Sequence, residues 1–159
     1  MAKIKWSTEP TGRRVVIDGM ITAAEDLTEL ASGSPPATPL TLDVGGIRAF
    51  TSSGIQAWLE TLRQLRGAGC RLVFERLSPA VVRQTMSIYD FLAGGAIRSV
   101  LAPYLCPACD AEVEEEIAVV DPPPAVAPTR RCTCGTDMDF DDLPGPYACL
   151  LREATGRPS

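Results

Sequence analysis

Four cysteines in the last third of the chain have the residue type and spacing to bind a metal ion. Cys106 and Cys109 form one close pair, and Cys132 and Cys134 form a second, with residues 110–131 between the pairs. Zinc prefers four thiolates arranged as a tetrahedron, and two tight turns can each supply two of them. We therefore predict a structural Zn²⁺ site. A catalytic zinc is not expected, because protein sulfurs would fill all four positions.

The remaining cysteines and the thiol chemistry leave alternatives open. Cys149 follows the second pair and is interpreted as a packing cysteine, or as the substitute ligand if one member of that pair does not bind. In a cytosolic protein, clustered pairs indicate a metal before a disulfide. The same thiolates would also suit a redox or metal sensor. Residues 104–151 resemble a zinc ribbon, which implies a small β lobe.

The sequence contains no histidine, which restricts the chemistry that the protein can perform. Ser-His-Asp and Cys-His arrangements and imidazole metal ligands are excluded. The sequence also lacks a phosphate-binding P-loop and the glycine-rich motif of dinucleotide-binding proteins. We therefore expect a protein that is not an enzyme.

Composition and charge indicate a folded protein of the cytoplasm. Apolar residues make up 45% and charged residues 22% of the 159 residues, so a hydrophobic core is expected. The net charge of −5 argues against direct binding of nucleic acid. No apolar run approaches the length needed to span a bilayer, and the N-terminus is too polar for a secretory signal. The oligomeric state is left open.

A second stretch that could carry chemistry is Thr51-Ser52-Ser53-Gly54, between an apolar strand and an amphipathic helix. Ser53 and Gln56 have the spacing of a capping box, in which the Ser53 hydroxyl would close the helix start. Ser52 would then lie one residue outside the helix and be exposed. A phosphate on Ser52 would face the positive end of the helix. The spacing allows two interpretations, a simple helix cap or a phosphorylation site.

The rest of the chain must supply the elements that position these residues. Strands are predicted at 3–8, 13–18, 40–44, 70–74 and 97–105. Helices are predicted after the first strand pair, after Ser53, and at Ser78-Pro79, where a capping serine precedes a proline suited to the first helical position. The alternation of strands and helices predicts an α/β fold with a mixed sheet and helices packed against it.

The character of the sequence changes near Tyr104. The paired cysteines, a proline-rich bend and many acidic residues follow it. We divide the chain into an α/β domain at 1–104, a small zinc-ribbon-like β lobe with four cysteine ligands at 105–151 and a flexible tail at 152–159. The acidic lobe is a plausible surface for docking another protein.

The first hundred residues resemble a STAS domain, the anti-sigma-factor-antagonist family, over roughly residues 5–103. The resemblance rests on small matches in the right order. The matching residues are Gly19 after the early strand, Asp43 at the end of the next strand, Ser52-Ser53-Gly54 before the helix, Gly69 and Leu72 around the following strand, and Ser78-Pro79 at the last helix. The family has an aspartate where this chain has Thr51.

The resemblance implies a function in partner switching. In that family the first serine of the Ser-Ser-Gly motif is the phosphoacceptor, so the role falls on Ser52, with Thr51 and Ser53 as alternatives. Partner serine kinases bind around this helix start and lose affinity for the phosphorylated product. The expected partner-binding residues are Asp43, Thr51, Ser52, Ser53, Gly54 and Gln56. Some members are never phosphorylated and act as adaptors or as subunits of transport complexes, which is the alternative function.

Overall fold

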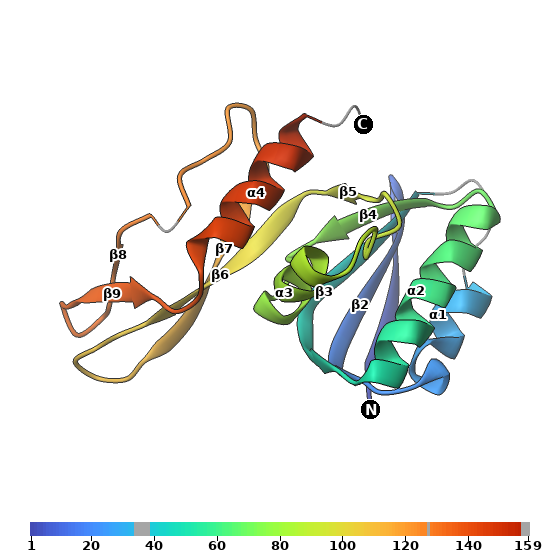
Figure 1. The fold of residues 1–159 in the computed structure, drawn as a ribbon, viewed down its shortest axis with the longest axis horizontal. Helices are drawn as coiled ribbons and strands as arrows, with labels where there is room; N and C mark the ends of the chain where they lie inside the picture. The colour runs from blue at the N-terminus through green and yellow to red at the C-terminus, as the bar shows by residue number, and fades with distance from the viewer. Residues whose placement is uncertain (34–38, 127, 157–159) are drawn as a thin grey trace.

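The computed structural model describes residues 1–33, 39–126 and 128–156. It is a mixed α/β fold built on two sheets, with helices packed against them (Figure 1). The predicted fold class, a mixed sheet with helices packed against it followed by a small cysteine-containing β lobe, is confirmed.

The first sheet has five strands in the order β1-β2-β3-β4-β5. The strands are β1 (Lys3–Glu9), β2 (Gly12–Ile21), β3 (Pro39–Phe50), β4 (Arg71–Glu75) and β5 (Ala96–Ile97). β1 and β2, at the first two predicted strands, form an antiparallel hairpin, and all other neighbours are parallel. Strand β3 is longer than predicted, because residues 46–50 continue to pair with β2 across two irregularities in register. Residues 45–50, beyond the predicted strand at 40–44, are therefore strand as well.

Helices pack against this sheet (Figure 1). They are η1 (Ala24–Leu27), α1 (Thr28–Gly33), α2 (Ser52–Gly67) and α3 (Pro79–Ser87). The start of α3 is as predicted, since the Ser78 hydroxyl accepts the Val81 N–H at 3.3 Å and Pro79 is the first helical residue. Helix α2 buries one stripe, which is the face that the spacing of its apolar residues predicts.

We call the first sheet with its helices η1, α1, α2 and α3 the first lobe, and the strands and helix that follow it the second lobe. An aromatic cluster forms the centre of the first lobe. Trp58 of α2 is fully buried, and its indole N–H donates a hydrogen bond of 3.0 Å to the Phe91 carbonyl. The rings of Phe50 and Phe91 lie 5.7 and 5.9 Å from the Trp58 ring, measured between centroids. Such pairs add stabilisation beyond burial alone. They hold α2 against the end of β3 and the loop before β5.

The second sheet has four strands in the order β7-β6-β9-β8. Its strands are β6 (Ser99–Leu105), β7 (Glu112–Ala118), β8 (Arg130–Arg131) and β9 (Asp137–Phe140). The single strand predicted at 97–105 is divided at Arg98, whose N–H donates to the Phe74 carbonyl and whose carbonyl accepts the Val119 N–H, both at 2.7 Å. The chain thus passes from the first sheet to the second at Arg98. The predicted domain division at residue 104 stays a prediction.

Helix α4 (Pro144–Thr155) follows the second sheet and was not expected from the sequence. It buries Tyr147, Leu150 and Leu151. The helix includes residues 152–155, which were expected in a flexible tail. Residues 157–159 lie outside the described residues.

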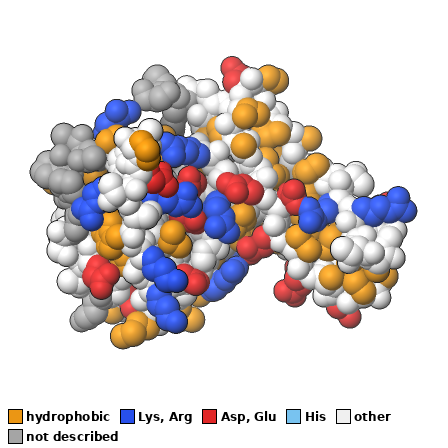
Figure 2. All heavy atoms as spheres, turned by 180° about the vertical axis from the view of Figure 1, so that it is seen from behind, with side chains coloured by type: hydrophobic (Ala, Val, Ile, Leu, Met, Phe, Trp, Pro, Cys, Tyr) orange, Lys and Arg blue, Asp and Glu red, His pale blue; other side chains and the backbone are white. Residues whose placement is uncertain are grey.

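The two lobes share one continuous set of buried apolar residues. From behind, Lys and Arg side chains are intermixed with Asp and Glu over the first lobe (Figure 2). Among the described residues, no helix has the length and apolar character needed to cross a membrane.

Candidate functional site

Helix α2 begins at Ser52, and Thr51 is its N-cap residue. The Thr51 hydroxyl accepts a hydrogen bond from the Gly54 N–H at 3.0 Å and donates one to the Thr22 carbonyl at 2.8 Å. The predicted capping box with Ser53 is therefore wrong. The reason is tertiary, because the carbonyl of Thr22, the residue after β2, holds the Thr51 side chain over the helix start.

Ser52 and Ser53 are the first two residues of α2, and both side chains are exposed. Within the described parts of the chain, neither hydroxyl has a hydrogen-bond partner, and the N–H groups of these two residues also have none. Gln56 is exposed in the same region. The helix start therefore presents two free hydroxyls beside unpaired N–H groups, where the helix dipole places partial positive charge.

Gly54 lets α2 approach the backbone at the end of β2. A Cβ atom at this position would lie only 2.6 Å from the carbonyl carbon of Ile21, and closer still to the Ile21 oxygen. The Thr51 N–H also donates to this oxygen at 3.1 Å. The glycine of the Ser-Ser-Gly motif is thus required by packing, and it fixes the position of both serines.

The structure does not bring Asp43 to this surface. Its side chain is 2% exposed and accepts hydrogen bonds from Arg14 at 2.7 Å, Arg76 at 3.2 Å and the Gly45 N–H at 3.1 Å. Strand β3 continues from Asp43 to Phe50 before α2 begins. Asp43 lies nine positions before Ser52, the first residue of α2. Asp43 is placed to stabilise the sheet.

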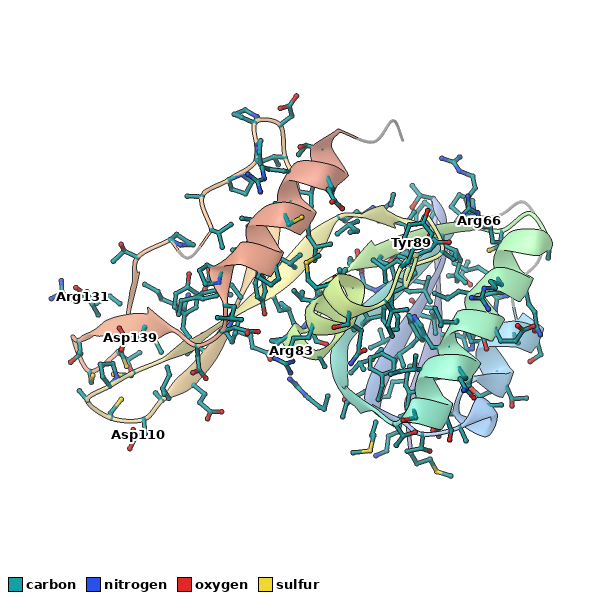
Figure 3. All side chains as sticks on the ribbon, viewed as in Figure 1. Arg66, Arg83, Tyr89, Asp110, Arg131 and Asp139 are labelled. Atoms are coloured by element: carbon teal, nitrogen blue, oxygen red, sulfur yellow. The ribbon has the colours of Figure 1, made fainter. Side chains whose placement is uncertain are left out.

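The four paired cysteines form a cluster at the outer end of the second lobe. Figure 3 shows sulfur atoms near the turn that carries Asp110, the residue after Cys109. All four Sγ atoms lie within 4.8 Å of one another, and the Cys106–Cys134 and Cys109–Cys132 sulfurs are each 3.5 Å apart. A tetrahedral zinc with bonds of about 2.3 Å separates its sulfurs by roughly 3.8 Å. The cluster can therefore hold a metal ion.

The backbone of the two turns supports this role. Each turn has a left-handed residue directly after its second cysteine, Asp110 with φ 57° and Gly135 with φ 91°. This conformation tightens the turn and directs backbone N–H groups at the sulfurs. Hydrogen bonds from the Thr136 hydroxyl and N–H lower the pKa of Cys134 to about 6.

Crowding of the sulfurs opposes this lowering of the pKa at another cysteine of the cluster. The Ala111 N–H lowers the pKa of Cys109, but hydrogen bonds shared with the sulfurs of Cys132 and Cys106 raise it to about 12. Four thiolates in so small a space repel one another, and a divalent cation removes that repulsion. The donor set of four sulfurs suits zinc.

The other two cysteines lie apart from the cluster. Cys149, the alternative ligand, is on α4, and its thiol donates a hydrogen bond of 3.4 Å to Glu153. Cys70 is buried in the first lobe, and burial raises its pKa.

A comparison with protein families identifies the family of the first lobe. A family model described as "Mlab, STAS domain" matches residues 7–93, which is more than half of the chain. The chain belongs to the STAS domain family. STAS domains are protein-interaction domains, and the match includes the exposed start of α2. A comparison with curated proteins finds no match.

Sequence reasoning missed two features of this STAS protein. The capping role of Thr51 depends on the Thr22 carbonyl, so the local sequence offers no sign of it beyond a threonine at the right place. Helix α4 did have a local signal. Pro144 stands at its start, and Tyr147, Leu150 and Leu151 have helical spacing.

Proposed function

We propose that this STAS protein is a cytoplasmic partner-switching regulator, which acts by binding and not by catalysis. The start of α2 docks a serine kinase or an anti-sigma-type protein, and reversible phosphorylation of Ser52 changes the affinity. Through that partner the protein would act in signal transduction and in the regulation of transcription. The proposal does not involve direct contact with nucleic acid.

The exposed hydroxyl of Ser52 is the observation that carries this proposal. It stands in the first turn of a 16-residue helix with no hydrogen-bond partner among the described residues. A kinase can therefore reach it without breaking a contact of the fold. The added phosphate, of about −1.5 to −2 charge, would be favoured by the helix dipole and would alter the docking surface.

The alternative acceptors differ in what phosphorylation would cost the fold. The Thr51 hydroxyl makes two hydrogen bonds, so modification there would remove the helix cap. Ser53 is exposed like Ser52. Ser53 therefore serves as the matched control for Ser52.

An adaptor that is never phosphorylated is the second candidate. Thr51 favours this second function. The family has an aspartate at this position, whereas in this chain the first turn of α2 carries no acidic residue. In that case the start of α2 would bind a partner permanently in a larger complex.

We propose that the metal at the cysteine cluster is a structural zinc ion. Four sulfur donors at tetrahedral spacing support this, as do the turns that direct N–H groups at them. The closest sulfurs of the four clustered cysteines are 3.5 Å apart and not joined by disulfides, which agrees with a reducing cytoplasm.

The test is affinity capture from host lysate with four baits, wild type, Ser52→Ala, Ser52→Glu and Ser53→Glu. Mass spectrometry identifies the captured proteins and locates phosphate on the wild-type bait. We expect a kinase-like or anti-sigma-like partner on wild type, Ser52→Ala and Ser53→Glu, and its loss on Ser52→Glu. Phosphate should be found on Ser52.

The same partners on all four baits, with no phosphate on residues 51–53, would reject the switch and leave the adaptor. Loss of the partner with Ser53→Glu alone would move the acceptor to Ser53.

A further inference from the structure

The second lobe is fastened to the STAS sheet at a junction between β4 and β6. The Leu77 N–H donates to the Ser99 carbonyl at 3.1 Å, and the Leu101 N–H donates to the Leu77 carbonyl at 2.8 Å. Leu77 and Val100 thus form a parallel bridge between the two sheets. The side chains of Leu77, Ser99 and Val100 are buried. The second lobe is therefore part of the buried core at this junction.

A polar chain passes through the same junction. The Ser99 hydroxyl accepts the Arg76 N–H at 2.8 Å and donates to the Glu116 carboxylate of β7 at 2.6 Å. Arg76 also contacts Asp43, and its φ of 54° is uncommon for a residue other than glycine. Such a conformation persists where the surroundings hold it. Arg76 therefore depends on contacts from both sheets.

The lobe also reaches the segment that leads into α2. We call residues 47–56, the end of β3 and the first turn of α2, the β3–α2 corner. The Ile47 carbonyl accepts the Ser78 hydroxyl at 2.7 Å, one residue after Leu77. Arg48 pairs with Glu114 of β7 at 2.9 Å. The corner is thus held by the junction on one side and by β7 on the other.

The cysteine cluster lies at the far end of the strands that make these contacts. β6 runs from Ser99 directly to Cys106, and β7 begins three residues after Cys109. The Cys106 N–H donates to the Ala111 carbonyl at 2.9 Å, which closes the turn between the strands. A metal that fixes this turn also fixes the register in which β7 presents Glu114 and Glu116.

A contact on the other side of the lobe has the same effect. Arg83 of α3 reaches from the first lobe toward the second (Figure 3), where it pairs with Asp142 at 3.2 Å. Asp142 also accepts the Tyr147 hydroxyl at 2.9 Å. The second lobe therefore contacts α3 as well as the β3–α2 corner.

We propose that metal occupancy of the cysteine cluster is coupled to the order of the β3–α2 corner, through β7 and the Arg76–Ser99 junction. Loss of the metal would loosen β6 and β7, release Arg48 and Glu116 from their partners, and raise the mobility of the helix start. By linkage, a partner that orders the corner would in turn raise metal affinity. The coupling itself does not require that Ser52 is phosphorylated.

Hydrogen–deuterium exchange on the full-length chain tests this coupling, with Zn²⁺-loaded protein compared against chelator-treated protein. We expect exchange in residues 47–56 to rise about fivefold or more on chelation, the lower end of typical coupling between sites. The uncoupling variant Glu114→Gln/Glu116→Gln keeps all four cysteines and should lose most of this dependence. Glu112→Gln, on the same strand and without an ion pair among the described residues, should behave as wild type.

Three results would overturn the proposal. In the first, chelation opens residues 99–141 and leaves 47–56 unchanged, so the lobes are independent. In the second, exchange rises equally in every segment including β1, which indicates general destabilisation. In the third, the double variant and the single variant Glu114→Gln both keep the wild-type dependence. None of these results depends on a docking partner, so they are distinct from a failure of the proposed function.

Discussion

Replacement of Gly54 by alanine tests the close approach of α2 to the end of β2, on which the position of both serines depends. The new Cβ would lie 2.6 Å from the Ile21 carbonyl carbon, about 0.8 Å inside ordinary van der Waals contact. Both neighbours at the closest approach are backbone atoms of a strand end, so a side-chain rotation cannot relieve the clash. The first turn of α2 must move away.

The cost follows from that movement. Overpacking of this kind costs about 1–3 kcal/mol. The shift also weakens the Thr51 N–H bond to Ile21 and the Thr51 hydroxyl bond to Thr22, each worth about 0.5–1.5 kcal/mol. Alanine returns about 0.4–1 kcal/mol by restricting the unfolded chain. We expect Gly54→Ala to lower the free energy of unfolding by about 2–4 kcal/mol.

Urea unfolding, followed by the fluorescence of buried Trp58, measures this change at a fixed Zn²⁺ concentration. Gly67→Ala at the other end of α2 is the matched control, because a Cβ there meets nothing within 4 Å. The control should be neutral or up to about 1 kcal/mol more stable. A Gly54→Ala variant within about 0.5 kcal/mol of wild type would refute the packing argument, since surface changes away from such features fall in that range.

Three further predictions concern charge and metal. Hydrogen bonds from the Thr22 N–H, and then from its hydroxyl and the Ala2 N–H, lower the pKa of Asp26 from 3.8 to about 2. Its carboxylate therefore stabilises the fold above about pH 4, and this contribution is lost as the pH falls through about 2. Asp26→Asn should be about 1–2 kcal/mol less stable than wild type at pH 7, and urea midpoints across pH should converge below about pH 2. Asp43→Asn should lower the free energy of unfolding by about 2–3 kcal/mol in the same assay, because it leaves Arg14 and Arg76 without their shared carboxylate. An equal loss for Asp18→Asn, at an exposed aspartate, would contradict this prediction. Elemental analysis should find one zinc per chain in wild type and Cys149→Ser but a large loss in Cys109→Ser, whereas equal zinc in all three would exclude the cluster as the site.

Local patterns in the sequence carried much of the fold. The spacing of apolar residues after Ser53 predicted the buried face of α2, and Ser78-Pro79 predicted the start of α3. The four paired cysteines were expected to meet in space, and they do. These features depend on residues a few positions apart, whose geometry the helix period or a tight turn sets.

Other features depended on residues far apart in the chain. Thr51, not Ser53, caps α2 because the carbonyl of Thr22 lies beside it. Asp43 is paired in the interior with Arg14 of β2 and with Arg76, which directly follows β4. Sequence spacing cannot show which distant partner satisfies a polar group, since that partner is set by the pairing of strands.

The sequence by itself determined the cysteine ligand pairs, the Ser-Ser-Gly motif and the amphipathic helix that follows it. The tertiary structure decided which hydroxyl is engaged, which is free, and where the chain passes from one sheet to the other at Arg98. The physical reason is that hydrogen bonds and close packing are satisfied in three dimensions, whereas helix period and turn chemistry are satisfied along the chain.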